Sequence, residues 1–283
     1  MVIEAFTNPL KAEHKPWTLF FIGMIYATLG MFLSLWIFRE HASLVMIFLI
    51  CLASVPLMYA TLKFEEQKDL QNVKERVLLK EHAKALSFLL FLFLGVMIAL
   101  TFWYLVLPQE ISTTLFKIQS DTIVNINQHV AGNAISSTVI LTRIFLNNFK
   151  VLLFVLLFSF IYGLGAIFIL IWNASVIAAA LGNFIRVNMA TFASAAGLLK
   201  VGAYFQVASL GFFRYALHGV PEIGAYFVGG LAGGIISIAV IKHEFGTPAF
   251  SRILFDSADM ILVSVALLIF AAVVEVFVTP VLF

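Results

Sequence analysis

The stretch WTLFFIGMIYATLGMFLSLWIF, residues 17–38, runs for 22 residues without a charged side chain. A helix of that length rises by about 33 Å, enough to cross the roughly 30 Å of hydrocarbon in a bilayer. Comparable apolar runs recur at residues 43–62, 85–107 and 151–172. The chain is therefore predicted to lie in a membrane, where each polar side chain within a span must be paired, face a cavity or lie near an interface.

The composition supports a membrane protein and argues against other classes. Hydrophobic residues make up 62% of the chain and charged residues 11%, an apolar balance beyond that of ordinary soluble domains. The net charge of +2 is too small for nucleic-acid binding, which needs a concentrated basic face. Cys51 is the only cysteine, which excludes an internal disulfide and a cysteine-based metal cluster. We interpret residues 1–283 as one membrane domain and expect no cofactor and no metal.

The apolar runs predict an all-α polytopic membrane bundle of about seven transmembrane helices. In the N-terminal part, residues 1–107, the charged hairpin at 63–84 carries six Lys or Arg and is predicted to be cytoplasmic by the positive-inside rule. A docking surface for a soluble partner is the alternative reading of that hairpin. The connection at 108–148 is then extracytoplasmic. Segment 174–217 is predicted to form one crossing and one re-entrant or interfacial helix, with Arg186 on the cytoplasmic side.

A glycine-rich sequence marks the helix predicted at residues 221–241. Its glycines are spaced as a doubled small-xxx-small pattern, which lets helix backbones approach closely in lipid. The four residues are Gly229, Gly230, Gly233 and Gly234. We predict that they pack within their own subunit, with homodimerisation through this helix as the alternative.

Three polar residues recur at a spacing of four: Arg214, His218 and Glu222. This spacing predicts one polar cluster, in which Glu222 is the counter-ion of Arg214. The sequence HGVPE, residues 218–222, also predicts a helix start, with Glu222 in the first turn where a carboxylate is favoured. A helix cap and a functional site for an ion, a proton or a lipid head group are therefore both consistent with these residues.

Two further charges fall within apolar segments, Lys200 and Glu275. A carboxylate in an apolar helix is costly unless it is paired, protonated or close to the interface. The last predicted helix, residues 260–278, ends shortly after Glu275, so an interfacial position is one interpretation. Pairing with Lys200 or Arg214 is the other.

Sequence motifs of catalysis are missing from the chain. His243-Glu244 is followed by Phe245, Gly246 and Thr247, so the zinc-protease motif HExxH is not formed. No serine elbow, phosphate loop or dinucleotide fingerprint occurs in a credible context. We therefore predict no catalytic residues and a protein that is not an enzyme.

The C-terminal half resembles the stage II sporulation protein M family. The resemblance rests on FLNNFKVLLFVLLFSFIYGLGAIFILIWNASVIAAALG at residues 145–182, HGVPEIGA at 218–225 and the glycine-rich helix that follows. It covers a family-like core of about residues 140–245. Position by position, it singles out Asn148, Gly163, Gly165, Asn173, His218, Gly219 and Glu222.

The resemblance implies a non-enzymatic scaffold in the cell membrane, because the family's namesake localises cell-wall-remodelling partners in spore formers. We accordingly expect a multi-pass organiser of partner proteins, in contact with the lipid bilayer, with other membrane proteins and with further copies of itself. The alternative, read from the residues, is a channel or transporter that uses His218, Glu222 and the interrupted segment 174–217. Broken helices with buried polar groups often build transport sites.

Overall fold

The computed structural model describes residues 16–69, 75–131, 137–159, 164–190, 192, 197–241 and 246–282. These residues form helices and no strand, which confirms the predicted all-α class. Within them, seven helices are long and apolar enough to cross a membrane, which confirms the predicted bundle.

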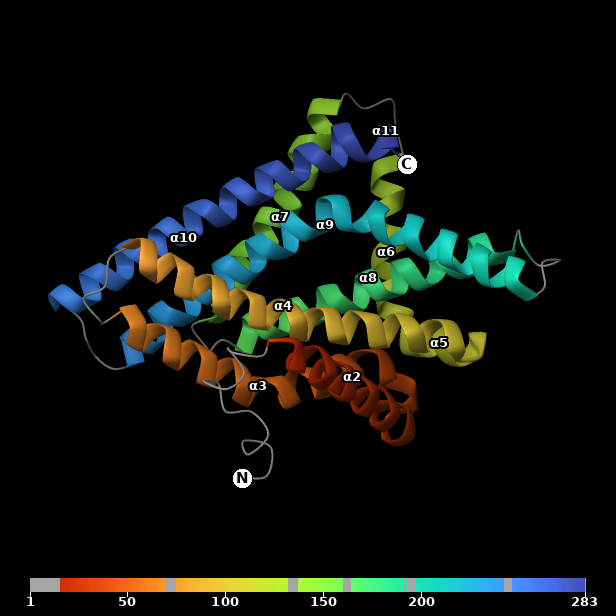
Figure 1. Ribbon diagram of the computed structural model, residues 1–283, viewed down its shortest axis with the longest axis horizontal. Coiled ribbons are helices and arrows are strands. Elements are labelled where there is room, and N and C mark those ends of the chain that lie inside the picture. Colours follow the sequence, from red (N-terminus) through yellow and green to blue (C-terminus); the bar gives the residue numbers. More distant parts are fainter. Residues whose placement is uncertain are drawn as a thin grey trace.

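The helices follow one another through short connections and lie in rough layers (Figure 1). Helices α2, α3 and α4 pack together, α8 lies against α3, α4 and α7, and α9 packs against α7, α8 and α10. The chain also contains a 3-10 turn, η1, and a π-helix, η2. The bounds are α2 Trp17–Ile37, η1 Arg39–His41, α3 Ala42–Asp69, α4 Glu75–Val106, α5 Gln109–Leu115, α6 Lys117–Ala131, α7 Ser137–Ser159, α8 Leu164–Ala190, α9 Gly197–Ile241, α10 Pro248–Val273, η2 Val274–Val278 and α11 Thr279–Leu282.

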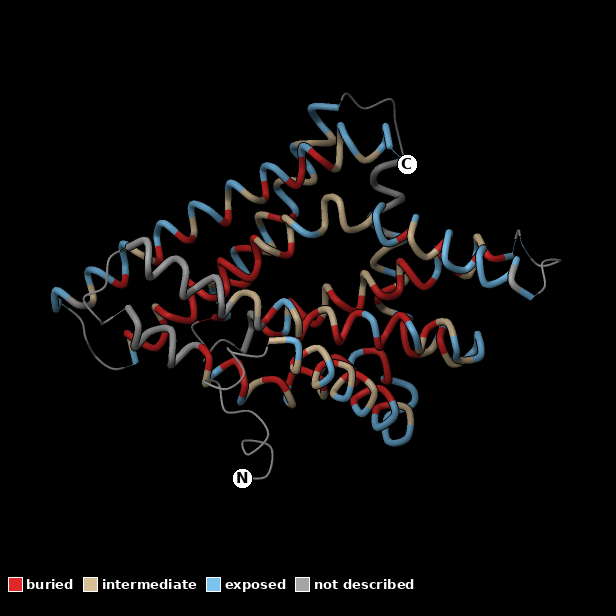
Figure 2. The backbone as a smooth tube through the Cα atoms, viewed as in Figure 1, coloured by how far each residue is buried: buried red, intermediate tan, exposed pale blue. Residues whose placement is uncertain are grey.

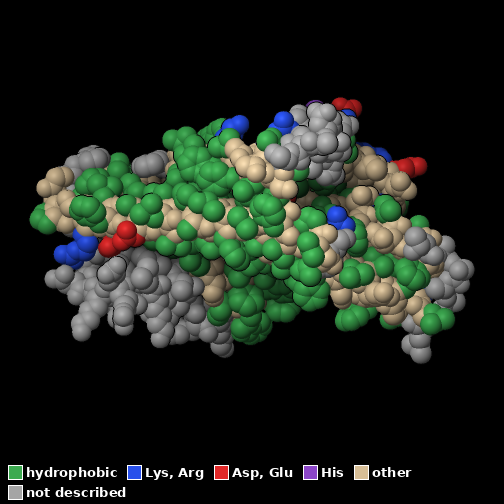
Figure 3. All heavy atoms as spheres, turned by 90° about the horizontal axis from the view of Figure 1, so that it is seen from above, with side chains coloured by type: hydrophobic (Ala, Val, Ile, Leu, Met, Phe, Trp, Pro, Cys, Tyr) green, Lys and Arg blue, Asp and Glu red, His purple; other side chains and the backbone are tan. Residues whose placement is uncertain are grey.

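Burial follows the layers, with buried residues concentrated where the helices face one another (Figure 2). The second half of α9 is the most enclosed segment and includes Tyr226, Leu231 and Ile235, none more than 1% exposed. Large apolar side chains also lie on the outside, such as Phe255 and Leu262 of α10. Hydrophobic side chains dominate the face drawn in Figure 3, and charged ones are few. Such a surface is stable only against lipid or another apolar partner.

Several predicted helix boundaries are wrong, including the start of the last helix, because α10 begins at Pro248 and not near residue 260. The apolar run at 151–172 does not form one helix, because its first part completes α7 and its last part begins α8. Segment 174–217 is shared between α8 and α9, so no separate re-entrant segment lies among its described residues. Pro221 lies inside α9, which continues through it, although Figure 1 shows α9 bending near its middle. A proline inside a membrane helix is tolerated where the surroundings or local adjustments of the helix compensate the missing hydrogen bond.

Arg186 lies at the end of the bundle where α4 gives way to α5, opposite to the predicted cytoplasmic side. Its guanidinium donates to the carbonyl oxygens of Tyr104 and, at 3.2 Å, Leu107, and to Ser112 Oγ at 2.9 Å. It also lies over the Tyr104 ring, 4.8 Å from the centroid. Arg186 therefore occupies the last carbonyls of α4, where a cation complements the negative end of the helix.

Replacing Arg186 with Met is expected to lower the melting temperature in detergent. The variant leaves two carbonyls and one hydroxyl without a charged donor, which costs about 1.5–3 kcal/mol. Arg39→Met is the matched control, because Arg39 is exposed. Equal melting temperatures for the two variants would show that the Arg186 contacts contribute nothing to stability.

Candidate functional site

A row of polar side chains follows one face of α9. Arg214, His218, Glu222 and Tyr226 are spaced by four residues, which places them on the same side of a helix. Exposure falls along the row: Arg214 is exposed, His218 and Glu222 are partly buried, and Tyr226 is 1% exposed. The row therefore leads from the surface of the protein into its interior.

Glu222 is held by neutral donors at the inner end of this row. The hydroxyl of Tyr226 donates to Glu222 Oε1 at 3.0 Å. The side-chain amide of Asn148, on α7, also donates to the Glu222 carboxylate. Asn148 is buried, and its Oδ1 accepts from Asn147 Nδ2 at 3.5 Å. Two helices thus supply hydrogen bonds to one carboxylate inside a membrane span.

A second carboxylate, that of Glu275, lies close enough to Glu222 for the two charges to interact. Glu275 belongs to the π-helix η2, an irregular turn that is frequent at functional sites. Thr279 Oγ1 donates to the carbonyl of Val274 at 3.2 Å and lies 3.5 Å from His218 Nδ1. The end of α10 is thereby joined to α9. We call these residues the carboxylate site: Asn148, His218, Glu222, Tyr226, Glu275 and Thr279.

The predicted charge pairs are not formed at this site. In the described part of the chain, no ion pair joins Glu222 to Arg214, and none joins Glu275 to Lys200 or Arg214. Lys200 is exposed. The helix-cap interpretation of Glu222 is also wrong, because α9 runs on through Pro221 and leaves Glu222 in a helix interior.

Sequence reasoning missed Tyr226 and Thr279. Tyr226 was detectable, because it continues the four-residue spacing that singled out His218 and Glu222. Thr279 gave no such signal. Its contact with His218 depends on the π-helix and on how α10 crosses α9, which a single sequence does not encode visibly.

The other residues that were predicted from the sequence do not belong to the carboxylate site. Asn173 donates to the carbonyl of Ile169 in its own helix at 2.8 Å. Gly165 lies in the first turn of α8, whereas Gly163 lies outside the described residues. Gly219 lies in α9 with open space on its side-chain face.

All four glycines of the GGLAGG sequence are buried. A Cβ atom on Gly229 would collide with Leu152, and one on Gly233 would lie 2.8 Å from Ser159 Cβ. Both contacts are with α7 of the same chain.

The carboxylate site offers oxygen ligands and proton carriers in a setting of low polarity. The repulsion between two nearby carboxylates is weakly screened in such a setting. Either one carboxylate binds a proton, or a cation binds between the two. Within the described ranges, no group of three or more His, Cys, Asp or Glu side chains could hold a metal ion. The oxygens beyond the two carboxylates come from Asn148, Tyr226 and Thr279. This set suits a proton or a small monovalent cation.

A family model described as Stage II sporulation protein M matches residues 85–280. The match begins within α4 and extends past Glu275, so it contains the whole carboxylate site. It is longer than the predicted core at 140–245. No match was found among curated proteins or among solved structures.

Proposed function

Because the chain belongs to the stage II sporulation protein M family and is an integral membrane protein, we propose that it is a multi-pass, non-enzymatic protein of the cell membrane that transports a monovalent cation. The transported ion, a proton or sodium, binds at the carboxylate site. One observation supports this proposal above all others: the Glu222 carboxylate lies in a membrane-spanning helix, accepts a hydrogen bond from Tyr226 and interacts with the Glu275 carboxylate of another helix.

The energetic argument starts from the cost of a buried charge. An ionised carboxylate in the membrane interior is expensive unless a cation compensates it. Among the described residues, the donors to Glu222 are the neutral side chains of Tyr226 and Asn148. A proton or cation shared by the two carboxylates removes both the desolvation cost and the repulsion. Binding of the proton or cation therefore stabilises the bundle.

Two irregular helices meet at the site, as in many transport sites. Pro221, next to Glu222, has no N–H and leaves the carbonyl of Leu217 without its usual helical donor. Glu275 lies in the π-helix. The outer residues of the row, Arg214 and His218, connect the pair to the surface. The two irregular helices give the site points at which it can change shape.

Flux measurements test the proposal directly. The full chain is reconstituted into liposomes that contain a pH-sensitive dye, and a proton or sodium gradient is imposed. We expect proteoliposomes to dissipate one of these gradients faster than empty liposomes. A rate equal to that of empty liposomes for both ions would overturn the proposed transport.

A scaffold role is the second candidate, and it is supported by family membership together with the first half of α9. That half exposes Leu199, Phe205 and Phe213, with Leu199 and Phe205 more than three-quarters exposed. Such a surface suits packing against other membrane proteins. Chemical cross-linking in native membranes, with Phe205→Ala as the variant, tests this role. A scaffold predicts loss of cross-linked partners with ion flux unchanged.

The multi-pass arrangement predicts that residues 63–84 and 108–131 lie on opposite sides of the membrane. Single cysteines at Gln71 and Glu110, in a Cys51→Ser background, are treated on intact cells with an impermeant thiol reagent. We expect labelling at Glu110 and not at Gln71, because the hairpin carries the excess of Lys and Arg. The reverse pattern would invert the topology, and equal labelling would contradict it.

A further inference from the structure

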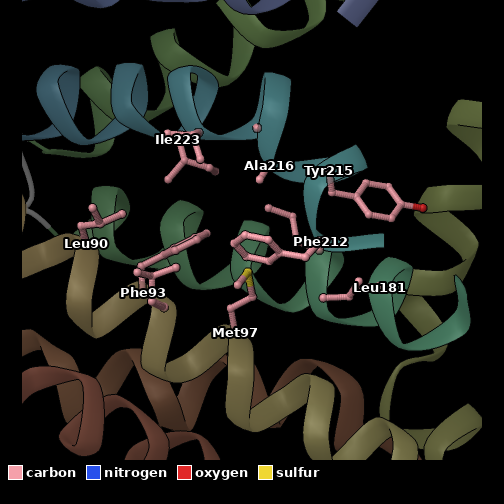
Figure 4. A pocket seen from close by; sticks show the side chains of 12 residues that line it. Leu90, Phe93, Met97, Leu181, Phe212, Tyr215, Ala216 and Ile223 are labelled. Atoms are coloured by element: carbon pink, nitrogen blue, oxygen red, sulfur yellow. The ribbon is translucent and has the colours of Figure 1, made fainter. Parts of the chain in front are cut away.

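Two cavities lie on the side of α9 that faces α4, α8 and α6, away from the carboxylate site. The first is an apolar crevice of about 520 Å³ of empty space between α4, α8 and α9. Its lining includes Phe93, Met97, Phe212, Ala216 and Ile223 (Figure 4). The second is a more open cavity between α6, α8 and α9, lined in part by Ser120, Asn183 and Asn188.

The two cavities are neighbours, because Tyr215 lines both. Figure 4 shows the Tyr215 hydroxyl pointing away from the apolar side chains of the crevice. The Tyr215 ring meets the ring of Phe184, which lines the second cavity, edge to face at 6.5 Å between centroids. The two cavities therefore adjoin at this aromatic pair.

The depth of each cavity matches its chemistry. The polar cavity lies near the end of α8, close to Arg186, which binds the last carbonyls of α4. The crevice is lined by α4 residues from Leu90 to Met97, which lie about 15–25 Å along the helix from Leu107. The polar cavity is thus at the interface and the crevice is within the hydrocarbon. A phospholipid in a bilayer has its head and its acyl chain at the same two depths.

Asn183 supplies a recognition group for the head. It lies in a membrane-spanning stretch of α8, lines the polar cavity and makes no hydrogen bond to the described residues. Asn183 is exposed, so its side-chain amide is available to donate to an acceptor at the interface. The ester and glycerol oxygens of a phospholipid provide acceptors at this level. We propose that these cavities form one phospholipid-binding site, with an acyl chain in the crevice and the glycerol and head group against Asn183 and Tyr215.

Retention of phospholipid by the purified chain tests this site. The full chain is delipidated in detergent, titrated with palmitoyl-oleoyl-phosphatidylglycerol and analysed by native mass spectrometry. Gly219→Phe places a ring in the crevice, because Gly219 lines it and a Cβ atom there meets nothing within 4 Å. Gly202→Phe is the matched control on the same helix, since Gly202 also has open space. We expect Gly219→Phe to weaken binding about tenfold, which corresponds to about 1.4 kcal/mol, and the control to bind like the unmodified chain.

The polar end is tested separately with Asn183→Leu, which is expected to weaken binding about fivefold through loss of one hydrogen bond. Photo-cross-linking of the unmodified chain by the same lipid with a diazirine in its acyl tail needs no variant to fold. We expect adducts on α4 or on α9 near Phe212. Wild-type affinity in either Gly219→Phe or Asn183→Leu, or adducts confined to the outer face of α10, would overturn the site. The proposed ion transport does not depend on this result.

Discussion

Replacing Gly95 with alanine is expected to lower the melting temperature sharply, although alanine is the better helix former. Gly95 lies where α4 crosses α2, and an added Cβ atom would collide with the carbonyl oxygen of Phe20. On the facing helix, a Cβ on Gly23 would collide with the carbonyl of Leu92. Both obstacles are backbone atoms, which cannot rotate away as a side chain can. The two helices must therefore separate, and overpacking of this kind costs about 1–3 kcal/mol.

Gly202→Ala is the matched control, because Gly202 is an exposed helical glycine with nothing within 4 Å of its side-chain position. Alanine there gains helix propensity, up to about 1 kcal/mol, and meets no obstacle. The two substitutions are thus expected to move the melting temperature in opposite directions. Tryptophan fluorescence during heating in one detergent measures both. A stabilised Gly95→Ala variant would show that α2 and α4 do not cross as closely as the fold requires.

Much of the fold follows from the sequence because the bilayer imposes simple constraints. Uncharged runs such as residues 17–38 have the length and polarity of a membrane crossing, so the number of spans is readable. The family resemblance was also readable, from combinations such as the HGVPE sequence and the glycine-rich helix. Helix boundaries within continuous apolar sequence could not be predicted. The interval near 160–163 has no charge, so hydropathy does not separate α7 from α8.

Proline and arginine misled the prediction for physical reasons. Pro221 is normally a sign that a helix starts, but α9 continues through it, as membrane helices can. Arg186 was counted as a loop charge, yet it binds the carbonyls that end α4. Glu222 was assigned to the nearest cation in the sequence, Arg214, and instead receives hydrogen bonds from Tyr226 and Asn148. Such pairings depend on how distant helices cross.

Replacing Glu222 with glutamine is expected to reduce ion flux strongly without weakening the fold. Glutamine keeps the shape of glutamate, and its Oε1 can still accept hydrogen bonds from Tyr226 and Asn148. The substitution also removes the repulsion between Glu222 and Glu275, so the melting temperature should stay the same or rise. Flux should fall by about tenfold or more, because a single carboxylate no longer shares the ion. Glu110→Gln, at an exposed position on α5, is the control and should leave both quantities unchanged.

The second carboxylate makes this prediction sharper. Glu275→Gln is expected to reduce flux as strongly as Glu222→Gln, although the two residues lie on different helices. The ion flux of the double variant should be no lower than that of either single variant. If the two carboxylates act as one unit, replacing either of them already removes its function. Tyr226→Phe removes one donor and should cause a smaller loss. Additive losses in the double variant would show that the carboxylates act separately. A marked fall in the melting temperature of Glu222→Gln would show that the pair is a structural contact and that the charge of Glu222 is needed to hold α7 and α9 together.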